Sequence, residues 1–176
     1  MRKLKVYIAI SLDGYIATAN GSIDWLTGFP NPDNTDYGYA DFLATTDTTF
    51  MGYTTYLDVL KLSETFPYSD KTNYVFTRQP GRTATADVQF IHTDIPAFVQ
   101  QVKAAAGKDI WLIGGGQLNA ALLQYDLIDE MILHMMPVVL GTGIPLFSGI
   151  ALEKTFRLTH SRAYDNSVLE LHYQKV

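Results

Sequence analysis

The stretch DIWLIGGGQLNAAL, residues 109–122, constrains the fold more than any other part of the sequence. Its apolar run, Ile110 to Ile113, is typical of a short strand that is buried on both faces. Three consecutive glycines follow, and apolar residues then recur at the spacing of a helix, at Leu118, Ala121, Leu122 and Tyr125. The segment therefore predicts a strand, a glycine turn and a helix.

The three glycines are costly at this position, because each destabilises a helix by roughly 0.5–1 kcal/mol relative to alanine. One interpretation is phosphate binding, in which bare backbone N–H groups and the positive end of a helix meet an anion. The other is a tight turn that packs close to a neighbouring strand. The pattern is not a P-loop, and Asn119 stands where the GxGxxG fingerprint needs its third glycine.

The rest of the chain alternates strands and helices, which predicts an α/β fold. We expect three layers, α/β/α, with a mostly parallel central sheet and a C-terminal antiparallel hairpin. The hairpin would turn at Asp165-Asn166, and Thr93 or Asp94 would cap the helix that follows the fourth strand. The expected strands cover residues 4–12, 48–51, 73–77, 88–91, 110–113, 130–140, 155–163 and 167–175. The residues from Tyr15 to Asp36 are predicted to form a long loop, of the kind that often acts as a lid.

Two further turns follow strands at the same edge of this sheet, where open parallel sheets bind their ligands. Gly52 opens a second strand–glycine–helix turn, and Thr55 lies one helical turn further along. Arg78 follows the third strand, and its fork of donors suits a phosphate. Together these features indicate a site for an NADP-type dinucleotide. Taken singly, Thr55 is better explained as a helix cap and Arg78 as a solvated surface charge.

Composition narrows the remaining possibilities. A chain of 176 residues suits one domain, 1–176. The net charge of −5 argues against nucleic-acid or anionic-membrane partners. Without cysteine there is no cysteine-ligated zinc, and we predict no metal site. No apolar run reaches membrane-spanning length, and no signal peptide is recognisable, so we expect a soluble cytoplasmic protein.

The ordered motifs of this chain resemble the dihydrofolate-reductase-like fold family over nearly its whole length. The branch it most resembles holds the reductase domain of riboflavin biosynthesis, the RibD C-terminal domain, and its stand-alone relatives. The motifs that carry the resemblance are ISLDGYIA (10–17), Asp24-Trp25, Met51-Gly52 with Thr55, FTRQPG (76–81), WLIGGG (111–116), Pro137-Val138 and GTGIPLF (141–147).

The resemblance implies that NADPH is the cofactor. The glycine triplet and Thr55 would hold its pyrophosphate, with a cis Gly114–Gly115 peptide, and the loop after Tyr15 would close over the nicotinamide. The implied binding residues are Ala9, Ile16, Ala17, Gly52, Thr55, Phe76, Thr77, Arg78, Ile113, Gly114, Gly115, Gly116, Gln117 and Leu118. A homodimer is also implied, with the run from Pro137 to Phe147 as one candidate contact.

Two departures from the family pattern weaken the case for folate as the substrate. Dihydrofolate reductases carry an arginine directly after the glycine of the second strand, where this chain has Tyr53. They also carry a carboxylate on the first helix, and Gly38 lies near that position here.

The leading hypothesis is an NADPH-dependent reductase of a small heterocycle, pterin- or pyrimidine-like. The alternative is a nucleotide-binding protein without catalysis. Asp13 and His134 are the candidate proton donors, and an Asp-Gly turn and a core histidine are their structural alternatives. Trp25 and Tyr39 are, with Asp13, the candidate substrate contacts, unless they are simply core aromatics.

Overall fold

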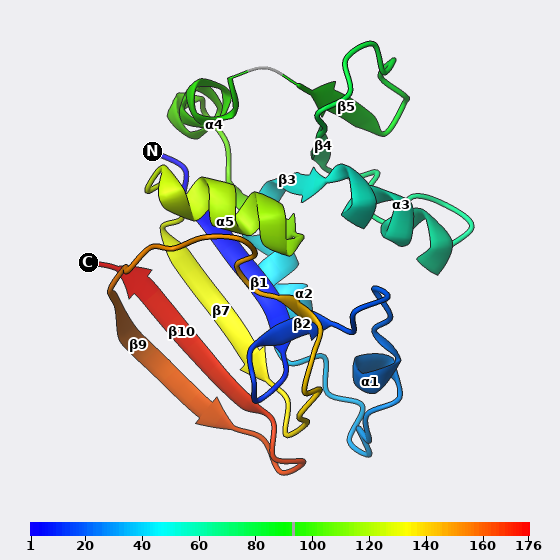
Figure 1. Cartoon of the computed structure of the whole chain (residues 1–176), viewed down its shortest axis with the longest axis vertical. Coiled ribbons are helices and arrows are strands. Elements are labelled where there is room, and N and C mark those ends of the chain that lie inside the picture. The colour runs from blue at the N-terminus through cyan, green and yellow to red at the C-terminus, as the bar shows by residue number, and fades with distance from the viewer. Residues whose placement is uncertain (93) are drawn as a thin grey trace.

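An eight-stranded mixed sheet forms the centre of the molecule in the computed structural model, which describes residues 1–92 and 94–176 (Figure 1). The strand order is β5-β4-β3-β6-β1-β7-β10-β9. The bounds are β1 Leu4–Ile10, β3 Thr46–Gly52, β4 Thr72–Phe76, β5 Val88–Ile91, β6 Asp109–Gly114, β7 Glu130–Met135, β9 Phe156–Ala163 and β10 Leu169–Lys175. The first six strands in this order, from β5 through to β7, pair in parallel. Strand β10 is antiparallel to β7, and β9 is antiparallel to β10, so the predicted fold class is confirmed.

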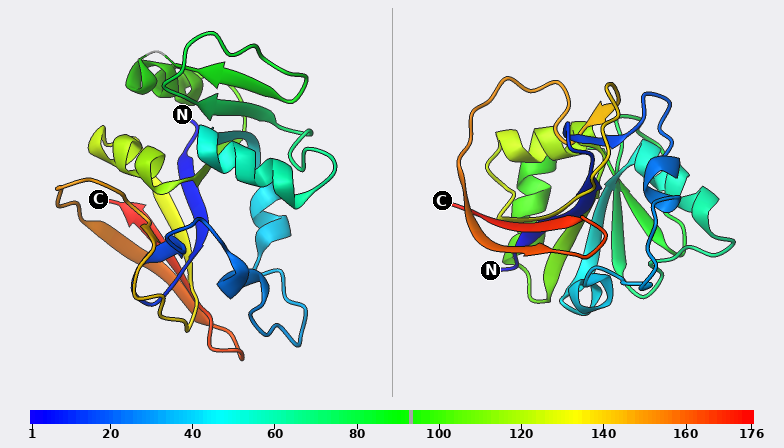
Figure 2. Two further views of the ribbon diagram at one scale, coloured as in Figure 1. Left: turned by 45° about the vertical axis from the view of Figure 1, so that its right-hand side comes forward. Right: turned by 90° about the horizontal axis from the view of Figure 1, so that it is seen from below.

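Helices cover both faces of this sheet, as Figure 2 shows for α5 and α2. On one face lie α4 (Ile95–Ala104) and α5 (Gly116–Gln124), and on the other lie α2 (Tyr39–Ala44) and α3 (Tyr53–Leu62). A short helix, α1 (Asp24–Thr27), stands beside them. Alternate residues of the central strands face the two layers, because side chains alternate along a strand.

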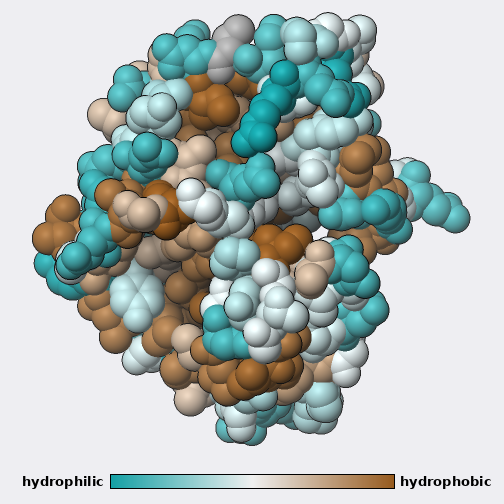
Figure 3. Space-filling model, viewed as in Figure 1, coloured by the Kyte–Doolittle hydropathy of each residue, from teal (hydrophilic) through white to brown (hydrophobic). Residues whose placement is uncertain are grey.

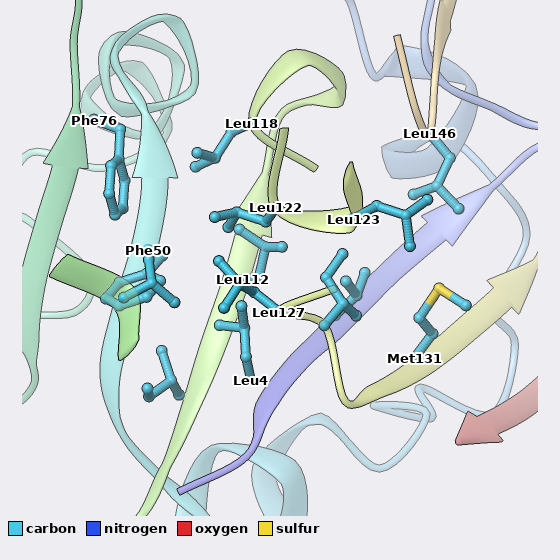
Figure 4. Close-up of a cluster of buried hydrophobic side chains, with 14 of the residues drawn as sticks. Leu4, Phe50, Phe76, Leu112, Leu118, Leu122, Leu123, Leu127, Met131 and Leu146 are labelled. Atoms are coloured by element: carbon cyan, nitrogen blue, oxygen red, sulfur yellow. The ribbon is translucent and has the colours of Figure 1, made fainter. Parts of the chain in front are cut away.

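The larger core lies on the α5 face. Leu122 of α5 lies over Leu112 of β6 and Leu4 of β1, and Leu118 points toward Phe76 of β4 (Figure 4). The smaller core lies under α3 and contains, among others, Met51, Val59, Val75 and Val88. The buried run predicted at 110–113 therefore serves both cores.

A two-stranded sheet that the sequence did not predict lies beyond the carboxyl end of β1. It pairs β2 (Tyr15–Ala17) with β8 (Ile144–Pro145), which are antiparallel. The prediction that a loop begins at Tyr15 is wrong here, because three residues are too few to show the periodicity of a strand. The pairing ties the start of the predicted lid to the glycine-rich segment near the C-terminus.

Several predicted boundaries also need correction. The strand expected at 130–140, with a break or bulge at Pro137, ends at Met135, because Pro137 cannot donate to a ladder. The first strand ends at Ile10 rather than Leu12. Asp94 caps α4 by accepting a hydrogen bond from the Ala97 N–H (3.1 Å), whereas Thr93 lies outside the described residues. Within the described part of the chain, no helix is long and apolar enough to cross a membrane.

Candidate functional site

The two glycine turns predicted from the sequence lie side by side. Strands β3 and β6 are neighbours, and Met51 pairs with Gly114. A methyl group built on Gly52 would lie 3.7 Å from the Gly114 oxygen and 3.8 Å from the Gly115 nitrogen. A methyl group on Gly115 would lie 3.2 Å from Thr55 Oγ1. The backbones of both turns and the Thr55 hydroxyl therefore lie close together, and we call this group of residues the glycine cradle.

The N-termini of α3 and α5 both open onto this cradle. The residues before them, Gly52 and Gly115, have extended backbones and no side chain that caps the helix. The positive ends of two helix dipoles thus meet at a point lined by bare backbone, which is a site suited to an anion. The Gly114–Gly115 peptide is cis, as the family resemblance implied.

The glycine triplet also satisfies the alternative interpretation, because its members differ in role. Gly114 has a φ of 114°, a backbone conformation that residues other than glycine rarely adopt. Gly116 packs against the segment at 145–148, where a methyl group would come within 2.4 Å of both the Pro145 oxygen and Ser148 Oγ. Close packing therefore explains Gly116, whereas Gly115 meets only the Thr55 hydroxyl and stays open to the cradle.

Asn119 joins this turn to the same segment from the second turn of α5. Its Nδ2 donates to the Leu146 oxygen (3.0 Å), and its backbone N–H donates to the Gly115 oxygen (3.0 Å). The side chain is fully buried. The residue that breaks the GxGxxG fingerprint therefore has a structural function that a glycine could not perform.

The loop after β4 reaches the cradle from a third side. Arg78 is exposed, and its Nη2 lies 3.4 Å from Oε1 of Gln117 in the first turn of α5. Thr77 Oγ1 accepts the Gln79 N–H (3.1 Å), which shapes the loop. Arg78 and Gln117 thus lie beside the cradle, and their binding of the cofactor stays a prediction.

Other predicted cofactor residues have side chains that pack in the protein core. The rings of Phe76 and Phe50 are 5.1 Å apart in the core, and Leu118 is buried in the same cluster. Only the backbone atoms of Phe76 and Leu118 are therefore available to a ligand. Ile113 packs partly buried on the α3 face.

The predicted nicotinamide residues lie around the ends of β1 and β2. Ala9 pairs with His134 of β7. Ile16 packs on the core and Ala17 is buried. A methyl group on Gly143 would come within 2.3 Å of the Ala17 oxygen, so the glycine-rich segment lies directly against β2.

Asp13 holds the glycine-rich segment to the end of β1. Its carboxylate accepts hydrogen bonds from Ser11 Oγ (2.6 Å), the Leu140 N–H (3.2 Å) and the Gly141 N–H (2.7 Å). The Ser11 hydroxyl, followed by these amides, lowers the pKa of the exposed carboxyl group. Asp13 is therefore held in its ionised form, as a turn residue would be, and an ionised carboxylate is a poor proton donor.

His134 is buried, with 4% of its surface exposed. Its Nε2 lies 3.1 Å from the Tyr37 carbonyl oxygen and must carry a proton to donate to it. Burial lowers the pKa of His134, so the ring is a neutral donor at neutral pH. This environment is that of a core histidine with a satisfied hydrogen bond.

An aromatic cluster that the sequence did not single out surrounds His134. The ring of Tyr7 lies 4.8 Å from His134, 4.5 Å from Phe42 and 5.8 Å from Tyr39. Burial raises the pKa of Tyr7, and its hydroxyl donates to the Tyr37 oxygen (3.0 Å). The one available signal was that Tyr7 lies between inward-facing aliphatic residues of β1 and must therefore face α2.

Trp25 lines an open pocket of about 540 Å³ between the segment at 18–25 and the segment at 140–142. Its indole Nε1 is buried and has no partner among the described residues. Trp25 and Asp13 thus both face the segment at 140–142, whereas Tyr39 lies in the aromatic cluster beside Trp111 (5.7 Å). The described residues contain no group of three metal-binding side chains arranged to hold an ion.

Comparison with known families decides how this arrangement is classified. The model of the RibD C-terminal domain matches residues 2–169. The chain belongs to the RibD C-terminal domain family. Its relatives include the uncharacterized protein YwjB of Bacillus subtilis (strain 168), which is 44% identical over 98% of this chain and 97% of that protein.

Solved structures show the same RibD C-terminal fold. A protein of Shewanella sp. PV-4 that is named for riboflavin biosynthesis is 31% identical, covers 99% of both chains and has a TM-score of 0.88. A diaminohydroxyphosphoribosylaminopyrimidine deaminase/5-amino-6-(5-phosphoribosylamino)uracil reductase of Thermotoga maritima is 16% identical, with a TM-score of 0.76. The match covers 99% of this chain but only 57% of the Thermotoga protein. At this low identity it shows the fold alone.

Proposed function

We propose that this member of the RibD C-terminal domain family is an NADPH-dependent reductase of a small heterocyclic compound. The proposed substrate is pterin- or pyrimidine-like and resembles the compound for which 5-amino-6-(5-phosphoribosylamino)uracil reductase is named. The observation that carries the proposal is the glycine cradle, in which two adjacent strand ends bring bare backbone and two helix N-termini side by side. A pyrophosphate is an anion of the kind that such helix N-termini bind.

The cofactor residues follow from this placement. The amides of Gly115 and Gly116 and the Thr55 hydroxyl would bind the pyrophosphate, and Arg78 the phosphate of the adenosine half. NADPH supplies the hydride, and the protein positions it and excludes water. The Trp25 pocket beside β2 is where we place the substrate.

The proton for the reduced product is best supplied through water. Asp13 is held ionised by three donors, and His134 lies in the core with its proton on the Tyr37 oxygen. Neither group is a good acid at neutral pH.

The shortage of acids favours one alternative, a dinucleotide-binding protein without catalysis. Two measurements separate the two functions. The first is a binding titration with NADPH, and the second is the absorbance of NADPH over time in the presence of each compound of a panel of pterins and pyrimidines. Binding with turnover of one compound class supports the reductase. Binding without turnover of any supports the alternative, and failure of NADPH to bind refutes both.

A further inference from the structure

Arg82 has an environment unlike that of an ordinary surface arginine. Its guanidinium carbon lies 3.7 Å above the centre of the Tyr53 ring, within the range of a cation–π contact. Tyr53 is the first residue of α3 and directly follows Gly52 of the glycine cradle. The stacked ring therefore fixes a positive charge beside one of the two helix N-termini at the cradle.

Arg78 has the corresponding position at the other helix. It approaches Gln117 in the first turn of α5, as described above. Both arginines come from the single loop that follows β4, between Thr77 and Arg82. One loop thus places one guanidinium against the first turn of each helix that opens onto the cradle.

The two charges are not neutralised by the protein. In residues 1–92 and 94–176, neither arginine forms an ion pair with a carboxylate. Arg82 Nη2 donates to Gln79 Oε1 (2.5 Å), but its Nε is buried without a partner in this part of the chain. Buried donors normally have acceptors, so the protein leaves part of the hydrogen-bonding capacity of Arg82 unused.

We propose that Arg82 is a specificity-determining residue, which binds the 2′-phosphate of NADPH together with Arg78. This inference rests on the proposed function, because it takes the dinucleotide as the ligand. A phosphate monoester carries close to two negative charges, and two guanidinium forks match both its charge and its oxygens. Where the related dihydrofolate reductases have an arginine, this chain has Tyr53, and the ring instead carries a guanidinium that arrives from the neighbouring loop.

The test is the affinity of wild type and Arg82→Gln for NADPH and NADH, which differ only in this phosphate. The matched control is Arg157→Gln, because Arg157 is likewise bonded to a glutamine (Gln174, 3.3 Å) but is exposed and lies at the opposite edge of the sheet. We expect Arg82→Gln to raise the Kd for NADPH by roughly 10–100-fold, as one charge-assisted hydrogen bond would. The Kd for NADH should change by less than about twofold, because the loss of even a weak hydrogen bond would change it by more than that.

A second variant, Tyr53→Leu, tests the role of the ring. It keeps both arginines but removes the stacking surface. The affinity for NADPH should therefore fall while that for NADH does not, and it should fall by less than in Arg82→Gln. The melting curve of Arg82→Gln should match wild type, because Arg82 is at the surface. Tyr53 packs against the smaller core, so the Tyr53→Leu data are interpreted at a temperature where its melting curve shows the variant to be folded.

The outcomes separate this inference from the proposed function. Equal losses for NADPH and NADH in Arg82→Gln, or no loss for either, would overturn the role of Arg82 while leaving the reductase proposal intact. A wild-type protein that binds neither dinucleotide would overturn both.

Discussion

Substitution of Gly52 by alanine should separate stability from ligand binding. Gly52 has a φ of −74° and a ψ of 158°, a conformation that alanine adopts readily. The added methyl group would meet only the Gly114 oxygen at 3.7 Å and the Gly115 nitrogen at 3.8 Å, which are ordinary van der Waals contacts. The folded protein therefore has no steric reason to be destabilised.

The expected stability change is a gain. A glycine-to-alanine change at a compatible position stabilises by about 0.4–1 kcal/mol, because the unfolded chain loses freedom. For a chain of this length that corresponds to a rise in Tm of roughly 1–4 °C.

The expected change in affinity has the opposite sign. The methyl group projects between the two turns of the glycine cradle, into the space we assign to the pyrophosphate. Displacing that group would remove two hydrogen bonds to a charged oxygen, at about 1.5–3 kcal/mol each. The Kd for NADPH should therefore rise by roughly 100-fold to 20,000-fold.

Thermal melting and calorimetric titration with NADPH measure the two effects on one sample. A more stable variant with lost affinity would exclude misfolding as the cause. A Gly52→Ala protein that binds NADPH as tightly as wild type would refute the assignment of the pyrophosphate to the cradle.

Three further predictions concern packing, pH and assembly. Gly116→Ala should lower the free energy of unfolding by about 1–3 kcal/mol, as overpacking does, because its methyl group would collide with the Pro145 oxygen; an unchanged urea midpoint would contradict this. Burial lowers the pKa of His134 below its usual 6.5, so its contribution to stability should be complete above that pH and be lost as the pH falls through the folded-state pKa. The acid-induced loss of stability in urea titrations should be smaller in His134→Asn, and identical pH profiles would show that another group is responsible. We also expect a homodimer that buries Val139 (66% exposed) and its neighbour Leu12 (53% exposed), so Val139→Asp should sediment as a monomer where wild type sediments as a dimer.

The surface adds a second candidate for such an interface. On the face drawn in Figure 3, apolar side chains gather over the half of the sheet that contains β7, β9 and β10. If Val139→Asp still sediments as a dimer, the glycine-rich segment is not the dimer interface, and this apolar face becomes the candidate.

The elements that could be predicted are those whose residues report locally on their environment. The apolar run before the glycine triplet is buried on both faces, so every residue in it had to be hydrophobic, and the strand was recognisable from sequence alone. The helices with an apolar stripe, α3, α4 and α5, were found for the same reason. The β2–β8 pair was not, because its stability comes from contact between segments almost 130 residues apart.

The candidate site divides in the same way. Gly52, Thr55, Arg78 and the glycine triplet could be assigned because motifs of fixed spacing follow predicted strands. Arg82 could not, since nothing near it in the sequence distinguishes it, and only the fold lays it on the Tyr53 ring. Asp13 was recognisable as a turn residue, but its partners at Leu140 and Gly141 are distant in the chain.

The sequence by itself determined the alternation of strands and helices, the family and the position of two glycine turns. Periodicity and motif spacing are local properties, and a residue pattern is enough to specify them. The tertiary structure alone decided that the two turns share one cradle, that Gly116 is required for packing, and that Asp13 and His134 are held in non-acidic states. Those properties depend on which distant atoms come within a few ångströms, and that is set by how the whole chain packs.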